Sequence, residues 1–151
     1  MERIASFTVD HNVLVPGLYL SRRDGNVVTF DLRFKKPNTG DLLTNAEMHS
    51  VEHVIATLLR NSPRKDAVVY FGPMGCQTGF YFLFDGAQLS ESEAVALVQQ
   101  VFARGAAYDG EMPGKSAAEC GNYRNLDVAL ARGCCRYYAE VIADWNVEKL
   151  V

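Results

Sequence analysis

The chain has 151 residues, a formal net charge of −3 and no cluster of basic residues, so nucleic acid is not expected as its main partner. Hydrophobic residues make up 48% of the chain and charged residues 22%, proportions typical of one globular domain, here residues 1–151. No apolar run is long enough to span a membrane and the N-terminus lacks the apolar core of a signal peptide, so we expect a cytoplasmic protein with no membrane contact.

Four strands are predicted from alternation and turn residues. In the clearest of them, residues 27–34, apolar side chains at the even positions alternate with Thr29, Asp31 and Arg33, so one face is apolar and the other polar. The turn at Asp24-Gly25-Asn26 before it suggests a hairpin. The expected strands are residues 17–22, 27–34, 67–72 and 79–84.

Three helices are predicted from capping and spacing. Thr44 and Glu47, like Ser90 and Glu93, have the spacing of a capping box, which starts one helix just ahead of His49 and a second at residue 90. We expect the first to close at Pro63, the second to run to about Arg104 and end at Gly105, and the third to run from about Asn125 to Trp145. The expected core positions are Met48, Val51, Ile55, Leu58 and Leu59 in the first helix, and Leu126, Leu130, Tyr137, Val141 and Trp145 in the third. These blocks of strands and helices predict an α+β fold, an antiparallel sheet with helices packed on one face.

A metal-binding pattern lies in the first predicted helix. Residues 49–53 read His-Ser-Val-Glu-His, an H-x-x-E-H pattern. Residues four apart share a helical face, so His49 and His53 can meet one cation, and Glu52 on the flank of that face can handle a proton. A catalytic site would need a third protein ligand and an exchangeable position. The alternative is a surface helix that carries these residues by chance.

The four cysteines include no Cys-x-x-Cys pair, which favours reduced thiols over disulfides. Cys120 lies in a glycine-containing loop before the last helix, where it is either the third metal ligand or a buried apolar residue. Cys76 follows Gly75 in a turn between two strands, and it is either an exposed base or nucleophile near a dication or a buried structural thiol. Cys134 and Cys135 lie mid-helix without polar neighbours, so we interpret both as structural.

Five blocks of the sequence occur together in one known family. Three of them are His-Ser-Val-Glu-His at 49–53, Pro-Met-Gly-Cys-Gln-Thr-Gly at 73–79 and Glu-Cys-Gly-Asn-Tyr at 119–123. The others are Ser-Phe with Asp-His-Asn within 6–12, and Asp-Leu-Arg-Phe with Pro-Asn within 31–38. In content, order and spacing they resemble the S-ribosylhomocysteine lyases, the LuxS proteins, over nearly the whole chain.

The resemblance implies an enzyme that cleaves the thioether of S-ribosyl-L-homocysteine, giving L-homocysteine and 4,5-dihydroxy-2,3-pentanedione, the precursor of autoinducer-2. It implies Fe²⁺, replaceable by Zn²⁺ or Co²⁺, and a homodimer with two active sites at the subunit interface. The residues that match the family's sites are the metal ligands His49, His53 and Cys120, the catalytic pair Cys76 and Glu52, and the substrate-pocket residues Ser6, His11 and Arg33. Arg60 either reaches the amino-acid end of the substrate across the dimer or is a solvated residue at a helix end.

The chain departs from the family at one place. Many members have Asp-x-Ser before the Pro-Met-Gly-Cys block, where this chain has Tyr70-Phe71-Gly72. Any ligand contact made by that acidic residue is therefore absent here or made by other groups.

Two other classes of protein also fit the metal pattern. An H-x-x-E-H metallopeptidase usually needs a larger chain, and it would give Cys76 no role. A metal-binding or regulatory protein without catalysis would leave Glu52 and Arg33 without a role, and a closed site would need a fourth protein ligand. Release of thiol from S-ribosylhomocysteine separates all three classes.

Overall fold

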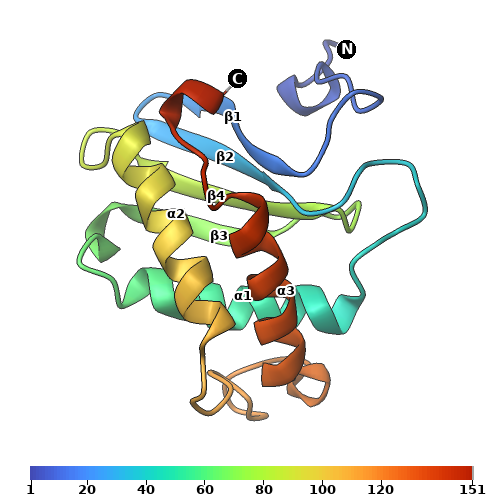
Figure 1. Ribbon diagram of the computed structural model, residues 1–151, viewed down its shortest axis with the longest axis vertical. Coiled ribbons are helices and arrows are strands. Elements are labelled where there is room, and N and C mark those ends of the chain that lie inside the picture. The colour runs from blue at the N-terminus through green and yellow to red at the C-terminus, as the bar shows by residue number, and fades with distance from the viewer. Residues whose placement is uncertain (151) are drawn as a thin grey trace.

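An antiparallel sheet of four strands forms the centre of the computed structural model, which describes residues 1–150 (Figure 1). The strands are β1 (Gly17–Asp24), β2 (Val27–Arg33), β3 (Val68–Pro73) and β4 (Gly79–Asp85), in the spatial order β1-β2-β4-β3. All four predicted strands are present. The first is two residues longer than expected, because Asp24 still pairs with Val27 across the turn.

Both faces of the central strand β2 are buried, although its sequence alternates between apolar and polar residues. Its apolar side chains pair with phenylalanines of β4, as Val28 with Phe84, Phe30 with Phe82 and Leu32 with Phe80. On the other face, Asp31 lies between its strand partners Tyr19 and Tyr81, and Arg33 is only 2% exposed. Asp31 and Arg33 form a buried ion pair on this face. Burying an ion pair costs free energy unless the charges are well hydrogen-bonded, so the polar face is a candidate functional surface.

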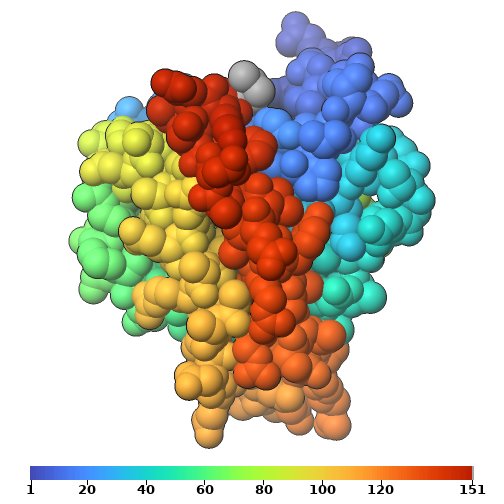
Figure 2. Space-filling view, in the orientation of Figure 1, coloured from blue at the N-terminus to red at the C-terminus, as the bar shows by residue number. Residues whose placement is uncertain are grey.

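Three helices cover the apolar face of the sheet: α1 (Asn45–Arg60), α2 (Glu91–Ala106) and α3 (Val128–Val141). Both predicted capping boxes are present, at Thr44–Glu47 and at Ser90–Glu93. All five core positions predicted for α1 are buried. In the space-filling view α2 and α3 lie side by side across this face (Figure 2). The expected α+β fold, with helices on one face of an antiparallel sheet in a single domain, is confirmed.

The prediction that Gly105 ends α2 is wrong. This glycine lies inside the helix, and a Cβ at that position would stand 2.7 Å from the Cys135 Sγ of α3. The absent side chain therefore permits close approach of the two helices.

The predicted bounds and buried face of α3 also need correction. The helix starts at Val128, after Asp127 accepts hydrogen bonds from the backbone N–H groups of residues 129 and 130, and it ends at Val141. Leu130 and Tyr137 are 36% and 40% exposed, so they are not core residues. The buried residues of the helix are Ala131, Cys134, Cys135 and Tyr138. Cys135 faces Gly105 of α2, where the two helices approach closely, and the larger Tyr138 is buried further along the same face.

Cys134 and Cys135 are buried free thiols, in agreement with the structural role predicted for them. Burial raises the pKa of the Cys135 thiol to about 12. Both thiols therefore stay neutral at physiological pH.

The described residues contain no helix with both the length and the apolar character needed to cross a bilayer.

Candidate metal and active site

Two segments far apart in sequence bring the three predicted metal ligands together. His49 and His53 project from α1, and Cys120 comes from the loop between α2 and α3. Their ligand atoms all lie within 4.8 Å of one another, and the Cys120 Sγ is 3.3 Å from the His49 Nε2. Each of the three residues is half-buried.

The two imidazole rings are held by hydrogen bonds on their far sides. His49 Nδ1 is 2.6 Å from the Asn125 Oδ1, and His53 Nδ1 is 2.8 Å from the Pro113 carbonyl oxygen. Both partners are acceptors, so each Nδ1 carries the hydrogen and each Nε2 has a free lone pair. Metal-bound histidines usually have such a second partner, which fixes the tautomer and the ring orientation.

These donors fit a first-row divalent metal. Tetrahedral bonds of about 2.0–2.1 Å to nitrogen and about 2.3 Å to sulfur would place neighbouring ligand atoms about 3.3–3.6 Å apart. For a nitrogen–sulfur pair the expected separation is at the upper end, about 3.5 Å, and the observed 3.3 Å between Cys120 Sγ and His49 Nε2 lies within about 0.2 Å of it. Two neutral imidazoles and one thiolate suit zinc, iron or cobalt better than magnesium or calcium, which prefer oxygen ligands. With three protein ligands, a fourth position remains for a water molecule or a substrate.

The start of α1 is anchored firmly, which limits how far the two histidines can move. Glu47 accepts the backbone N–H of Thr44 in the capping box and also accepts a hydrogen bond from Cys134 Sγ of α3. Burial alone would raise the pKa of Glu47, but the hydrogen bonds from Thr44 and Cys134 hold it below its usual value. The carboxylate therefore stays charged and ties α1 to α3 two residues ahead of His49.

Glu52 and the ligand His49 line an open hollow of about 240 Å³. The hollow is lined by Asn45, Met48, His49, Glu52, Pro73 and Asn122. Pro73 is the last residue of β3 and belongs to the block that also carries Cys76, so the hollow lies between the metal-motif helix and the end of β3. This is the space in which a small substrate could meet both a metal and a carboxylate.

Cys76 belongs to a neighbouring polar cluster on the turn after β3. Its thiol is exposed, so the alternative of a buried structural thiol is wrong. The Cys76 Sγ lies 3.0 Å from the Thr78 Oγ1 and 3.9 Å from the Arg33 Nη1. Arg33 also donates to Thr78 Oγ1 at 2.7 Å and forms an ion pair with Asp31 at 2.5 Å. A buried, fixed guanidinium thus places a positive charge beside an accessible sulfur.

The other predicted substrate residues lie apart from the three ligands. Ser6 lines a hollow of about 230 Å³ on the polar side of the sheet, together with Thr29 and Tyr70. His11 is close enough to Asp31 for its charge to act on that carboxyl, whose pKa is raised by burial and lowered in part by Arg33 and His11. Arg60 donates to the carbonyl oxygens of Val68 and Val69 at the start of β3. The substrate-binding roles of these residues stay predictions.

Several residues of the site were not predicted from the sequence. The sequence predicts Asn125 only as the approximate start of the third helix, and it assigns no role to Pro113. Gly114 has φ +68° and leaves room for the His53 ring. These residues act through contacts with a distant helix, which no local pattern reveals.

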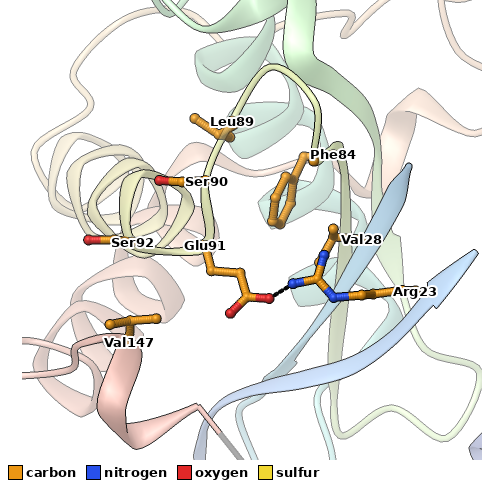
Figure 3. Close-up of a pocket in the computed structure, with 9 residues that line it drawn as sticks. Arg23, Val28, Phe84, Leu89, Ser90, Glu91, Ser92 and Val147 are labelled. Carbon is orange, nitrogen blue, oxygen red and sulfur yellow. Dashed lines mark ion pairs between the residues drawn. The ribbon is translucent and has the colours of Figure 1, made fainter. Parts of the chain in front are cut away.

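A larger hollow, of about 420 Å³, lies at the opposite end of the sheet, where β1 ends and α2 begins (Figure 3). Arg23 of β1 and Glu91 of α2 point toward each other across it and form an ion pair. No histidine or cysteine lines this hollow, and its two charges satisfy each other. It is therefore a poorer candidate for the metal site than the smaller hollow beside His49.

The fold and the site together define a class: small α+β proteins with an open candidate site of two histidines and one cysteine. A family model described as S-Ribosylhomocysteinase (LuxS) matches residues 4–149. The chain therefore belongs to the LuxS family, and it is an enzyme of the lyase type, as the sequence blocks predicted.

Proteins named S-ribosylhomocysteine lyase are similar in sequence to this chain over nearly their full lengths. The S-ribosylhomocysteine lyase of Desulfotalea psychrophila is 48% identical over 148 residues, covering 94% of this chain and 92% of that protein. The S-ribosylhomocysteine lyase of Finegoldia magna is 43% identical, covering 100% of this chain and 98% of that protein. That of Phocaeicola vulgatus is 41% identical, covering 99% and 96%. This agreement favours a lyase over a metallopeptidase or a regulatory metal-binding protein.

Proposed function

We propose that this protein is a metal-dependent carbon–sulfur lyase that converts S-ribosyl-L-homocysteine to L-homocysteine and 4,5-dihydroxy-2,3-pentanedione, the autoinducer-2 precursor. The observation that carries the proposal is the meeting of His49, His53 and Cys120 within 4.8 Å in a member of the LuxS family. A proton-transferring carboxylate, Glu52, stands beside them at an open hollow.

The proposed reaction requires protons to move at carbon atoms next to a carbonyl group. The sugar carbonyl migrates along the ribose chain by enolisation, in which one carbon loses a proton and its neighbour gains one. Homocysteine then leaves by β-elimination: a C–H proton is removed, the C–S bond breaks, and the sulfur takes the electron pair. A divalent metal held by the three ligands would supply a Lewis acid for the carbonyl oxygen.

Two side chains are proposed to carry the protons. Glu52 lines the hollow beside His49. Cys76 follows three residues after Pro73, the residue of β3 that lines this hollow. A carboxylate on one side of the substrate and a thiolate on the other can serve successive carbons of the chain. Arg33 is fixed by Asp31 and Thr78, so its charge stays beside the Cys76 sulfur through the cycle.

The substrate is proposed to bind through its sugar and its amino-acid end. Ser6, His11 and Arg33 would contact the ribose. Arg60 would contact the amino-acid end of a substrate bound by the partner subunit, although its guanidinium is hydrogen-bonded to β3 in the single chain.

We propose Fe²⁺ as the native metal, with Zn²⁺ and Co²⁺ as functional substitutes. The metal acts only as a Lewis acid, and the donor set of two imidazoles and one thiolate accepts all three ions.

We also propose a homodimer with two active sites at its interface. Several large apolar side chains are exposed in the single chain: Phe7 at 64%, Val13 at 73%, Val69 at 41% and Tyr70 at 50%. Large apolar side chains left exposed in a single chain are common at protein–protein interfaces. These residues belong to the N-terminal segment and β3, near the polar side of the sheet that includes Ser6.

The reaction is proposed to take place in the cytoplasm, where free thiols such as these four cysteines stay reduced. Its direct consequence is the recycling of a by-product of the methyl cycle, and its second product is a precursor for quorum sensing.

The test is to measure thiol release from S-ribosylhomocysteine with a thiol reagent, using protein reconstituted with Co²⁺. The proposal expects substrate-dependent thiol release by the metal-loaded protein and little release by the metal-free protein. His53→Ala is the matched control, because it removes one ligand and should lower both metal content and turnover. Metal-loaded protein that releases no thiol would contradict the proposed function.

A further inference from the structure

We propose that Asn125, supported by Asn45, is a positioning residue that holds His49 in the tautomer and orientation needed to bind the metal. The inference rests on the proposed metal site and adds residues that lie outside the five family-like blocks.

The hydrogen bonds give the Asn125 amide a defined direction. Its Nδ2 donates to the Asn45 Oδ1 at 2.8 Å, and its Oδ1 faces the His49 Nδ1 at 2.6 Å. The oxygen can only accept, so the His49 Nδ1 must carry the hydrogen. The lone pair of His49 is then on Nε2, the atom 3.3 Å from the Cys120 Sγ.

The reverse orientation of the amide would disable the ligand. An Nδ2 turned toward His49 would donate to Nδ1, and the neutral ring would then carry its hydrogen on Nε2. That hydrogen would point to the place where the metal is proposed to bind. The bond from Asn125 to Asn45 therefore favours the amide orientation in which His49 is ready to coordinate.

The two histidines are supported in different ways. His53 is oriented by the backbone carbonyl of Pro113, which a side-chain substitution there does not remove. His49 depends on one side chain, Asn125, in the short 3-10 turn Tyr123–Asn125. The loop that supplies Cys120 thus also supplies the group that orients a ligand on α1. The sequence of this loop therefore affects two of the three ligands: Cys120, which the loop contains, and His49, which the loop residue Asn125 orients.

A purely structural role, clipping the loop to α1, is the competing explanation. The loop has a second attachment, in which the Asp127 backbone N–H donates to the Ser50 Oγ at 2.9 Å. That bond does not involve Asn125, so loss of the Asn125 side chain should leave the end of the loop on α1. The effect of substituting Asn125 should therefore fall mainly on His49.

The experiment compares Co²⁺ affinity and the visible Co²⁺ spectrum for the wild type, Asn125→Leu and Asn125→Asp, each titrated against a chelator. Asn125→Leu removes the acceptor at similar size, and we expect Co²⁺ affinity to fall about 10- to 100-fold, the usual cost of losing such a partner. Asn125→Asp keeps an acceptor and makes it anionic, so affinity should stay at least as high as in the wild type, with shifted Co²⁺ bands. Asn61→Ala is the control, because Asn61 bonds only to Thr57 at the other end of α1 and should change nothing at the metal.

Thermal unfolding of the metal-free proteins separates positioning from clipping. If Asn125 positions His49, the Asn125→Leu variant should lose Co²⁺ affinity without a matching loss of thermal stability in the metal-free protein. Two results would overturn the inference without contradicting the metal site. One is a Co²⁺ affinity of Asn125→Leu within about threefold of the wild type, and the other is a Co²⁺ affinity of Asn125→Asp as low as that of Asn125→Leu. A wild-type protein that binds no Co²⁺ would overturn the metal site and this inference together.

Discussion

Replacing Gly114 with alanine should weaken metal binding through a methyl group that touches His53. Gly114 has φ +68°, and a Cβ there would lie 3.0 Å from the His53 Nδ1 and 3.1 Å from its Cε1. The ring cannot retreat freely, because the same Nδ1 donates to the carbonyl of the preceding residue, Pro113, at 2.8 Å. The ring must therefore shift by a few tenths of an ångström and turn its Nε2 away from the other ligands.

The Gly114→Ala substitution is expected to lower two separate quantities, the folding stability and the metal affinity. The left-handed backbone of a non-glycine residue costs about 1–2 kcal/mol, which lowers the melting temperature by about 2–4 °C per kcal/mol in a protein of this size. Displacing an oriented ligand should lower metal affinity about 10- to 100-fold, equivalent to about 1.4–2.8 kcal/mol of binding free energy.

Gly40→Ala is the matched control. Gly40 also has a left-handed backbone, with φ +81°, but a Cβ there would meet no atom within 4 Å. Both variants should lose similar stability without metal, whereas only Gly114→Ala should lose affinity for Zn²⁺ or Co²⁺. The assay is chelator competition together with thermal unfolding with and without metal. Equal metal affinity in the two variants would refute the steric argument.

Four further predictions concern chemistry, stability, assembly and the metal. Cys76→Ala and Glu52→Gln should each retain metal and lose thiol release about 10²- to 10⁴-fold, because each lacks one proton carrier; near-normal turnover of Cys76→Ala would leave Glu52 as the only carrier. The Cys135 thiol, with a pKa of about 12 in the fold against 9.0 when unperturbed, stays neutral while the unfolded chain ionises, so stability is lost as pH rises above 9. Between pH 8 and pH 10 this thiol should cost about 1.3 kcal/mol of unfolding free energy, and an unchanged pH slope in Cys135→Ala would contradict that assignment. Sedimentation of active protein should give a dimer, and an active monomer would remove the cross-subunit role of Arg60. The Fe²⁺ form should lose activity in air while the Zn²⁺ and Co²⁺ forms keep it, and an air-stable iron enzyme would count against this account of the metal.

The sequence by itself determined the features that depend on near neighbours in the chain. The two capping boxes, the β1–β2 hairpin and the alternation of β2 follow from residues within a few positions of one another. The helical pair His49 and His53 is of the same kind, because a four-residue spacing fixes their common face in any α-helix. For Cys120 and Cys76 the local sequence left two alternatives each, and the resemblance of their blocks to a family favoured a metal ligand and a proton carrier.

Tertiary structure decided which surfaces approach each other. Where α2 and α3 meet at Gly105, the small Cys135 is buried, whereas the larger Leu130 of the same helix is 36% exposed. The burial of Arg33 follows from its place in the central strand, which its polar character did not predict. The orientation of His49 by Asn125, 76 residues away, depends on where the loop after α2 folds back onto α1. Such contacts arise from the packing of whole elements, so no local pattern in the chain encodes them.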